Sequence, residues 1–432
     1  MLRVCGVLLS SLFINGFANA DNIYLYVNSP LDKKGPSENC DVPLCSSLIE
    51  LIESSNSTID FAIYGLRGQP YILKALERAK NRGVLVRGIV DKTTENKSYY
   101  SDTWRLERLI TNTRSDLEHD RRTLKKLQKR NNWSGKEKCD RPKGHVGPLQ
   151  CFEGEGYASK ADINFQGDIM HHKFFVVDSA VVWSGSANIS DTGVGGYNAN
   201  NVVVIESQAV AQLFTEEFNR MFQDGLFHRG KGKTKKSTSV WVETRNKQEL
   251  LIAFSPQDYA VYSAVMPLLK TAEKSVDIAM FFLTHREISR ELVKAHKRGV
   301  SVRVILDATG ATNEYSKHKY LRDAGVPVKV ENWGGKMHMK SALIDQKHLI
   351  IGSMNWTSAG ESKNDENTIV IKDFADSEVF SAFYSELWRS IDDKWLQYDP
   401  KPESLDSGFA CFDGIDNDFD DQVDGDDPGC NS

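Results

Sequence analysis

An internal repeat is the feature that most restricts what this chain can fold into. Residues 59–91 and 276–307 each read as an apolar-rich strand, an amphipathic helix with a basic end, a glycine and a β-rich run that ends in aspartate. The glycines, Gly83 and Gly299, stand where a helix C-terminus favours a positive φ. Each segment therefore predicts a βαβ unit, and two copies indicate a duplicated α/β module, not a solenoid of many repeats.

A second pattern follows each βαβ unit. Residues 171–188 read HHKFFVVDSAVVWSGSAN and residues 338–355 read HMKSALIDQKHLIIGSMN, so both fit H-x-K-x4-D-x6-G-S-x-N without a gap. Residues two apart on a strand point to the same face, so each histidine and its lysine can face one pocket. A buried core histidine would explain one such residue, but it does not explain two matched sets.

These residue types suit a phosphoryl group. Lysine supplies positive charge, serine and asparagine donate hydrogen bonds to oxygens, and histidine attacks or shuttles a proton. Covalent cleavage of a phosphodiester needs a nucleophile and an acid for the leaving oxygen, and each half offers one motif histidine. Two halves related by a pseudo-twofold axis would supply both at one shared site.

With these motifs the sequence resembles the phospholipase D superfamily over about residues 23–395. The second half, with GSMNWT and NDENTIVI, is similar to the compact endonuclease and cardiolipin-hydrolase branch. The resemblance implies an α/β fold of two similar lobes, each a mixed β-sheet flanked by helices, packed as a pseudo-twofold internal dimer. It also implies a phosphohistidine intermediate attacked by water or an alcohol, with no metal or other cofactor in the chemistry.

The resemblance carries over to individual motif positions. It implies catalytic roles for His171, Lys173, Asp178, His338, Lys340 and Asp345, and substrate binding by Ser186, Asn188, Ser353 and Asn355. The two aspartates are expected to brace hairpins more than to touch substrate.

The halves differ at one position that matters for the chemistry. The compact branch has a downstream glutamate that hydrogen-bonds the catalytic imidazole; here that place holds Glu366 in the second half and Asn200 in the first. A carboxylate behind a histidine makes it a stronger base or nucleophile. The sequence therefore predicts Glu366 as a catalytic residue, His338 as the nucleophile and His171 as the acid. Two alternatives stay open: elsewhere in the superfamily the first histidine is often the nucleophile, and Asp191 can substitute as the carboxylate of the first half.

The N-terminus and the cysteines predict export. Residues 1–20 combine Arg3, a short apolar stretch and the cleavage-type sequence Ala18-Asn19-Ala20, which together read as a signal peptide. We therefore expect a secreted or periplasmic protein. An even number of cysteines in the remaining chain indicates disulfides, and their proximity in sequence favours Cys40–Cys45, Cys139–Cys151 and Cys411–Cys430.

The repeat also predicts the domain organisation. We expect a first lobe at 21–227, a basic linker at 228–247 that is solvated at 228–236, a second lobe at 248–395 and an acidic tail at 396–432. Asp91 lies 80 residues before His171, whereas Asp307 lies only 31 before His338, so the first half carries an insertion, placed at about 95–165. Its segment 121–143 holds ten bases against two acids, typical of a charged surface helix or of a flank that holds an anionic polymer or membrane.

Charge is unevenly placed in the chain, whose net charge is −5. The tail holds 11 acids and one base, so the body that precedes it is mildly basic. Within the tail the spacing of positions 1, 3, 5, 9 and 12 of a calcium loop is matched by Asp416, Asp418, Asp420, Asp424 and Asp427, with Asp421 where a glycine is expected. The sequence predicts structural calcium here, remote from the catalysis; a bare acidic tail is the alternative.

Three functions fit these features. The first is a secreted phospholipase D-type hydrolase of phospholipid head-group esters, and the second is a metal-independent endonuclease that cleaves DNA or RNA. The third is a phosphate-binding protein without catalysis, which only Asn200 favours. The expected partners are an anionic phosphodiester and, through peripheral contact, a membrane, and the expected state is a monomer that contains an internal pseudo-dimer.

Overall fold

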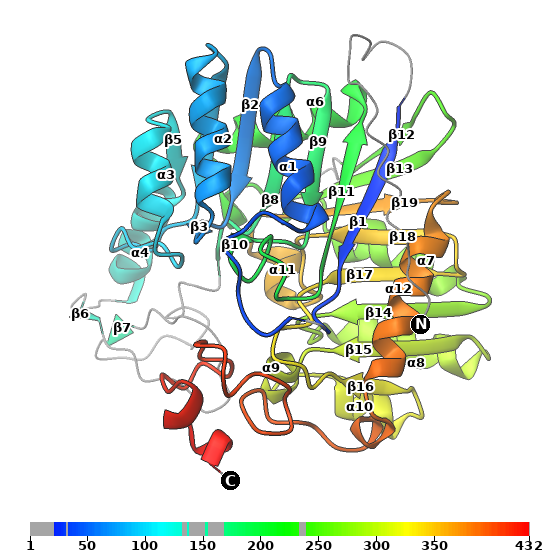
Figure 1. Ribbon diagram of the computed structural model, residues 1–432. Coiled ribbons are helices and arrows are strands. Elements are labelled where there is room, and N and C mark those ends of the chain that lie inside the picture. The colour runs from blue at the N-terminus through cyan, green and yellow to red at the C-terminus, as the bar shows by residue number, and fades with distance from the viewer. Residues whose placement is uncertain are drawn as a thin grey trace.

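The computed structural model describes residues 21–31, 33–131, 136–137, 152–153, 168–232 and 239–431. Two similar α/β lobes are joined in one chain, and Figure 1 shows the sheet of the first lobe above that of the second. The first sheet has the strand order β1 (Ile23–Asn28), β11 (Asn200–Glu206), β9 (Val181–Gly185), β8 (Lys173–Val177), β2 (Thr58–Ile63), β4 (Leu85–Val90), β5 (Thr113–Ser115). The second has the order β12 (Val240–Glu243), β13 (Glu249–Ser255), β19 (Glu366–Ile371), β18 (His348–Gly352), β17 (Lys340–Ile344), β14 (Ser275–Met280), β15 (Ser301–Leu306), β16 (Val328–Val330).

The two sheets match strand for strand, with β12 as an added edge. In each, the strand that begins with the motif lysine pairs antiparallel with the first strand of a βαβ unit, whose two strands are parallel. Two short ladders complete the strands: β3 (Leu66–Arg67) with β10 (Ile189–Ser190), and β6 (Lys136–Glu137) with β7 (Phe152–Glu153). The predicted mixed α/β fold with two similar lobes is therefore confirmed.

Helices flank both sheets, with α6 (Gln208–Phe222) and α12 (Ser377–Ser390) on the inner faces between the lobes. Those of the first lobe are α1 (Pro43–Ser54), α2 (Pro70–Asn81), α3 (Thr103–Leu109), α4 (Leu117–Asn131) and α6 (Gln208–Phe222). Those of the second are α7 (Met266–Thr271), α8 (Arg286–Lys297), α9 (Ala308–Thr312), α10 (His318–Asp323), α11 (Ser358–Ser362) and α12 (Ser377–Ser390). Short helical turns occur at η2 (His228–Gly230), η3 (Val261–Val265), η4 (Asp393–Leu396), η5 (Asp424–Asp426) and η6 (Pro428–Asn431). The repeat helices α2 and α8 are followed by Gly83 and Gly299, each at φ 91°, as predicted.

Alternation along the strands divides the apolar residues into three cores. On β8, Phe174 and Val176 face the core between the lobes, whereas Phe175 and Val177 face α1 and α2. The central core combines the inner faces of both sheets with α6 and α12, and there the rings of Phe214 and Phe254 lie 5.1 Å apart. Because apolar residues from both lobes fill one core, the lobes pack as an internal dimer.

The structure corrects two predicted boundaries. Helix α3 and strand β5 correspond to α10 and β16, so the inserted segment begins after β5, at α4, not near residue 95. The predicted solvated linker is wrong at His228 and Lys231, which are only 1% and 3% exposed, and β12 within it belongs to the second sheet. Carboxylates from both lobes compensate the two buried cations, which is why a basic sequence can be buried here.

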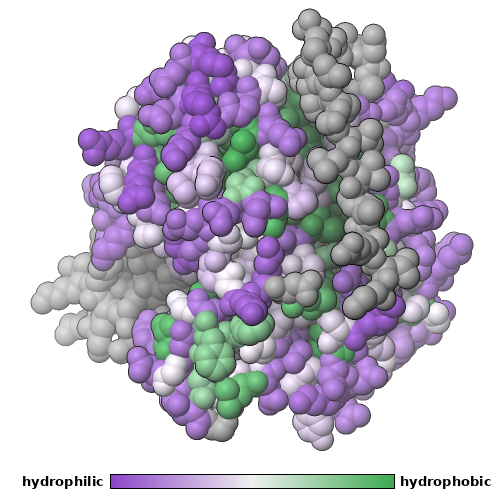
Figure 2. All heavy atoms as spheres, viewed as in Figure 1, coloured by the Kyte–Doolittle hydropathy of each residue, from purple (hydrophilic) through white to green (hydrophobic). Residues whose placement is uncertain are grey.

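Two of the predicted disulfides are present, Cys40–Cys45 and Cys411–Cys430. The signal peptide at 1–20 and the Cys139–Cys151 pair lie outside the described residues. Among the helices of the described ranges, none has both the length and the apolar composition that crossing a bilayer requires. The face in Figure 2 is largely hydrophilic, with apolar side chains gathered near the C-terminal tail, where Leu405, Phe409 and Phe412 are exposed.

Candidate active site

Each motif histidine stands just before a central strand and is anchored to the opposite lobe. His171 precedes β8, and its backbone N–H donates to the Asp365 carbonyl over 3.0 Å. His338 precedes β17, and its N–H donates to the Ala199 carbonyl over the same distance. These bonds belong to two isolated β-bridges between the lobes, which occupy equivalent places in the repeat: Met170 pairs with Asp365, and Met337 pairs with Ala199. Backbone pairing across the lobes therefore sets the position of both histidines.

The carboxylate predicted for the second half serves the first histidine. Glu366 follows Asp365, and both of its carboxylate oxygens lie 2.9 Å from Nδ1 of His171. Asp191, the alternative for the first half, instead pairs with Arg67 at 2.7 Å. The prediction that Glu366 supports His338 is wrong, because the bridge between the lobes brings the residue after Asp365 behind the opposite histidine.

The second histidine has neutral partners. Nδ1 of His338 lies 3.1 Å from Oδ1 of Asn200 and 3.1 Å from the Ser186 carbonyl oxygen. Because both partners are oxygens, Nδ1 carries the hydrogen and Nε2 faces away from them. The two histidines thus share a geometry but differ in charge: a carboxylate stands behind one and an amide behind the other.

The motif serines orient these partners. The Ser186 hydroxyl donates to Oδ1 of Asn200 over 2.9 Å, and the Ser353 hydroxyl donates to Oε2 of Glu366 over 2.7 Å. Their hydroxyl hydrogens are therefore engaged within the protein, contrary to the prediction that they bind substrate directly. The predicted amides differ, since Oδ1 of Asn188 and of Asn355 is buried without a hydrogen-bond partner in the described part of the chain.

Both motif lysines are buried. The Lys173 ammonium donates to the carbonyl of His171 over 2.8 Å, and Lys340 donates to that of His338 over 2.6 Å. Burial lowers the pKa of Lys173 to about 7, and burial together with the charge of Lys173 holds the pKa of Lys340 well below its ordinary value. An anionic ligand between them would favour their charged forms.

The four motif groups form one electrostatic cluster. Burial, Lys173 and Lys340 hold the pKa of His171 well below its ordinary value. Burial, Lys340, Lys173 and His171 do the same to the pKa of His338. Burial raises the pKa of Glu366 to about 7. Each histidine also contacts a side chain of the other lobe, Glu366 or Asn200, so both motifs meet at the interface between the lobes.

The motif aspartates lie at the opposite strand ends from the lysines. Asp178 follows β8 and accepts backbone N–H groups of Asn56, Ser57 and Thr58 over 2.7–2.9 Å. Asp345 follows β17 and accepts those of Glu273, Lys274 and Ser275 over 2.7–3.1 Å. The structure thus places both carboxylates where they brace a hairpin, and not among the histidines.

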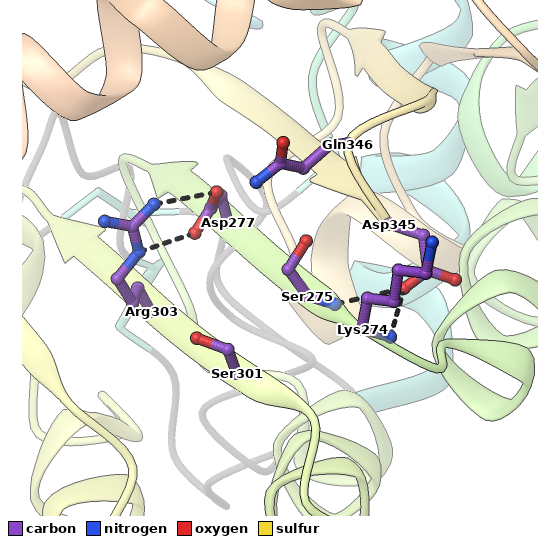
Figure 3. A pocket seen from close by; sticks show the side chains of 7 residues that line it. All are labelled: Lys274, Ser275, Asp277, Ser301, Arg303, Asp345 and Gln346. Atoms are coloured by element: carbon purple, nitrogen blue, oxygen red, sulfur yellow. Dashed lines mark hydrogen bonds and ion pairs between the residues drawn. The ribbon is translucent and has the colours of Figure 1, made fainter.

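A surface pocket of about 400 Å³ also lies at this far end of the second sheet (Figure 3). Asp345 lines it beside an ion pair in which Nε and Nη2 of Arg303 lie 2.8 and 2.9 Å from the carboxylate of Asp277. Its walls come from strand starts and the hairpin turn, so it is separate from the histidine cluster.

Sequence reasoning missed two aromatic residues at the site. Tyr64 follows β2 and its ring lies 5.4 Å from that of His171, while Phe281 follows β14 and its ring lies 5.0 Å from that of His338. Lys340 lies 4.9 Å from the centre of the Phe281 ring. Aligning the two repeats would have found them, because they occupy the same position in IDFAIYGL and VDIAMFFL.

A buried ionic network also escaped the sequence analysis. Nδ1 of His228 lies 3.0 Å from Asp365 and Nε2 lies 3.1 Å from Asp116, so one imidazole links the lobes. Although burial lowers the pKa of His228, the surrounding carboxylates, Asp365 foremost, raise it well above its ordinary value. Lys231 contacts Asp365 at 2.6 Å and also pairs with Glu217. The network thus holds the segment that anchors the first histidine.

The tail departs from its prediction in two ways. Carboxylate oxygens of Asp416, Asp418 and Asp420 lie within 4.8 Å of one another, and those of Glu403, Asp418 and Asp427 form a second such group. Asp424 is in neither group and instead accepts N–H groups of Asp413 and Gly414. The tail also contacts Lys336, two residues before His338, so the prediction of a position remote from catalysis is wrong.

Comparison with known proteins agrees with this architecture. The family described as "Cardiolipin synthase, PLD-like domain" matches residues 48–222 and 265–388. The mitochondrial cardiolipin hydrolases of Mus musculus and Danio rerio are 30% and 34% identical over 146 and 141 residues, or 34% and 32% of this chain. A phospholipase D of Rickettsia conorii is 35% identical over 102 residues, or 24% of the chain. The matched parts span 66%, 62% and 51% of these relatives.

The fold extends beyond these matches. Phosphatidylserine synthase of Haemophilus influenzae, at 13% identity, superposes with a TM-score of 0.56 over 86% of this chain and 88% of its own. Two matched lobes with one shared histidine–lysine cluster define the class of protein. The chain belongs to the phospholipase D superfamily, in the PLD-like domain family matched above.

Proposed function

We propose that the chain is a phosphodiesterase that cleaves its substrate through a phosphohistidine. One observation carries this proposal: two buried histidines, each with Nδ1 held from the opposite lobe, lie with two buried lysines at the interface between the lobes. The positive charge of the two lysines suits the oxygens of a phosphoryl group, and the side-chain NH2 groups of Asn188 and Asn355 are donors that suit the same oxygens.

The charge difference assigns the two roles. Nε2 of His171 attacks phosphorus, because the Glu366 carboxylate stabilises the positive charge that develops on the ring. The bond from phosphorus to the leaving oxygen breaks, and that oxygen takes a proton from His338. Asn200 gives the His338 cation no carboxylate, so His338 releases its proton more readily. Water then loses a proton to His338, attacks phosphorus and breaks the bond to His171.

A trapping experiment tests these roles. Bis(p-nitrophenyl) phosphate has leaving groups that need little protonation, so His338→Ala should form the adduct but hydrolyse it slowly. We expect a burst of one nitrophenolate per protein and a mass increase located on His171. His171→Ala should give no burst. An adduct on His338 in the His171→Ala protein would reverse the assignment.

The surface beside the first histidine favours a lipid substrate. Tyr99 is 41% exposed and its ring lies 5.6 Å from that of Tyr64, which contacts His171. On α3 the exposed Trp104 lies beside Arg105. Aromatic and basic side chains together suit the surface of an anionic bilayer. With relatives named cardiolipin hydrolase and phospholipase D, we propose hydrolysis of phospholipid head-group esters at a membrane surface.

Nucleic acid is the second candidate, because an exposed tyrosine near the nucleophile can also stack on a base. We would offer cardiolipin vesicles and single- and double-stranded DNA to the same protein, in EDTA and in CaCl2. Trp104→Ala should reduce vesicle hydrolysis about tenfold by weakening interfacial binding. Tyr320→Ala, which removes an exposed aromatic residue from the equivalent helix α10, serves as the matched control. DNA cleavage without lipid turnover would establish the nuclease instead.

We also propose that the protein is exported and acts as a monomer. The Cys40–Cys45 and Cys411–Cys430 disulfides suit an oxidising compartment, in line with the predicted signal peptide. One chain supplies both histidines, so no second copy is needed. A mature N-terminus at Asp21 and a monomeric native mass would support both points.

A further inference from the structure

The acidic tail is bonded to both lobes beside the second histidine. Tyr197, in the first lobe, donates its hydroxyl hydrogen to Oδ2 of Asp413 over 2.6 Å. In the second lobe, Thr309 and Lys336 each donate to the carbonyl oxygen of Asn417 over 2.8 Å. Figure 1 shows the tail running past the lower lobe on the side of α9.

These contacts fall on the segments that position His338. The backbone N–H of Lys336 donates to Oδ1 of Asn198 over 3.0 Å, and its carbonyl accepts the N–H of Ala199 over 2.8 Å. Asn200, the partner of the His338 ring, comes next in the chain. The tail therefore contacts the segments, at 197–200 and 334–338, that hold the proposed acid and its amide.

Carboxylates crowd around the tail residue that makes this contact. Asn417 lies between Asp416 and Asp418, and its N–H donates to Glu403 over 2.6 Å. The two carboxylate groups described above share Asp418, and together they contain Glu403, Asp416, Asp418, Asp420 and Asp427. In the described chain none of the five forms an ion pair with lysine or arginine. The repulsion among these carboxylates is therefore not compensated by paired lysine or arginine side chains.

One member of this cluster lacks the partner that its burial requires. Asp427 is 3% exposed, and its Oδ2 accepts no hydrogen bond from any described residue. A buried carboxylate oxygen without a partner costs free energy, which a cation would offset. Nearby, Asp421 adopts φ 72°, the left-handed conformation that a glycine takes at this place of a calcium loop.

We propose that Ca²⁺ binds among Glu403, Asp418, Asp427 and the neighbouring aspartates, and that it thereby holds Asn417 against Lys336 and orders the segment that positions His338. Hard carboxylate oxygens suit Ca²⁺ better than they suit a soft metal, and Ca²⁺ tolerates irregular ligand arrangements that Mg²⁺ does not. In this proposal the cation takes no part in the reaction itself and affects it only by fixing the position of His338. The effect on turnover rests on the proposed function, whereas the ordering does not.

Hydrogen–deuterium exchange on the full chain tests the ordering directly. After treatment with EDTA, added CaCl2 should slow exchange at 197–200 and 334–338 about tenfold. Asp427→Asn should abolish this response and weaken Ca²⁺ binding in calorimetry. Asp426→Asn removes the same charge from an exposed neighbour outside both carboxylate groups and should behave as wild type.

A second variant separates binding from coupling. Tyr197→Phe removes the bond to Asp413 and should still bind Ca²⁺, but with less slowing of exchange at 197–200. In turnover of bis(p-nitrophenyl) phosphate, CaCl2 should raise kcat of the wild type about tenfold and that of Asp427→Asn little. No Ca²⁺ binding by the wild type, or binding without slower exchange at 334–338, would overturn the proposal. Slower exchange with no turnover under any condition would instead overturn the proposed function and leave the cation site supported.

Discussion

At the scale of single residues, one amide–carboxylate difference sets the chemistry of the site. The histidines have matched backbone anchors and matched serines, yet Glu366 stands behind His171 and Asn200 behind His338. A carboxylate stabilises a charged ring, whereas an amide orients a ring without favouring its charge. In the proposed mechanism this difference makes His171 the nucleophile and His338 the acid.

Replacing Glu366 with Gln should therefore impair the attacking histidine while keeping its orientation. We expect kcat to fall about 10²–10⁴-fold with little change in KM, as when a triad carboxylate is lost. Turnover of bis(p-nitrophenyl) phosphate measures this. Asn200→Asp is the matched change on the other side and should move the alkaline limb of the kcat profile upward, because a carboxylate raises the pKa of His338. Equal losses in both variants would contradict the assignment.

Burial of the Lys173 ammonium should lower the free energy of unfolding. Burial lowers the pKa of Lys173 to about 7, so between pH 7 and 10.5 the unfolded chain binds more protons than the folded one. This cost of burial is therefore fully present below pH 7 and disappears as the pH rises toward 10.5. Lys173→Met should abolish turnover yet raise the free energy of unfolding at pH 6 by about 1–3 kcal/mol. Urea unfolding at pH 6 and at pH 10 should show the larger gain at pH 6, and a loss at pH 6 would contradict it.

At the scale of elements, each motif hairpin has the residues of the proposed chemistry at one end and a residue that stabilises the fold at the other. In the β8–β9 and β17–β18 hairpins, the first strand has five residues. It begins with the motif lysine and is followed directly by the motif aspartate. Period-two alternation along these strands made the hairpins predictable from sequence, as the glycine after each repeat helix made the helix ends predictable. The pairing of one lobe's loop with the other lobe's histidine was not predictable, because an internal repeat does not show which copies meet.

Asp178→Asn and Asp345→Asn should accordingly destabilise the protein and leave its chemistry intact. Each should lower the free energy of unfolding by about 1–2 kcal/mol at pH 7, with kcat within about threefold of the wild type. Although burial raises it, the N–H donors hold the pKa of Asp178 below its ordinary value. Its stabilising contribution is present above that ordinary value and is lost as the pH falls through the folded pKa. Thermal unfolding at pH 7 and pH 3 tests this, and a large loss of kcat with normal stability would refute it.

At the scale of the whole molecule, the segment between the lobes is part of the interface. The sequence HRGKGKTKK reads as solvated because four of its residues are lysine and none is acidic. Its burial depends on Asp116, Glu217 and Asp365, which lie 112, 14 and 137 residues from their partners and so could not be inferred locally. Charges distant in sequence decide this part of the fold.

Lys231→Met should leave Asp365 and Glu217 short of a partner and destabilise the protein by about 3–5 kcal/mol. Arg229→Met, in the same segment, breaks a pair with Asp168 in which the arginine side chain is 53% exposed, so it should cost about 1 kcal/mol. Denaturant unfolding followed by tryptophan fluorescence measures both. Similar small losses in the two variants would show that the network does not hold the lobes together.

The crossed pairing gives the substrate a direction. Two identical halves could accept a diester either way round, since either histidine would serve as attacker. In the proposed mechanism the two ester groups of the substrate are distinguishable, because the departing group lies beside His338 and the retained group on the far side. A single exchange between amide and carboxylate at the position of Asn200 or Glu366 would therefore be sufficient to give a duplicated, symmetric site a preferred orientation for its substrate.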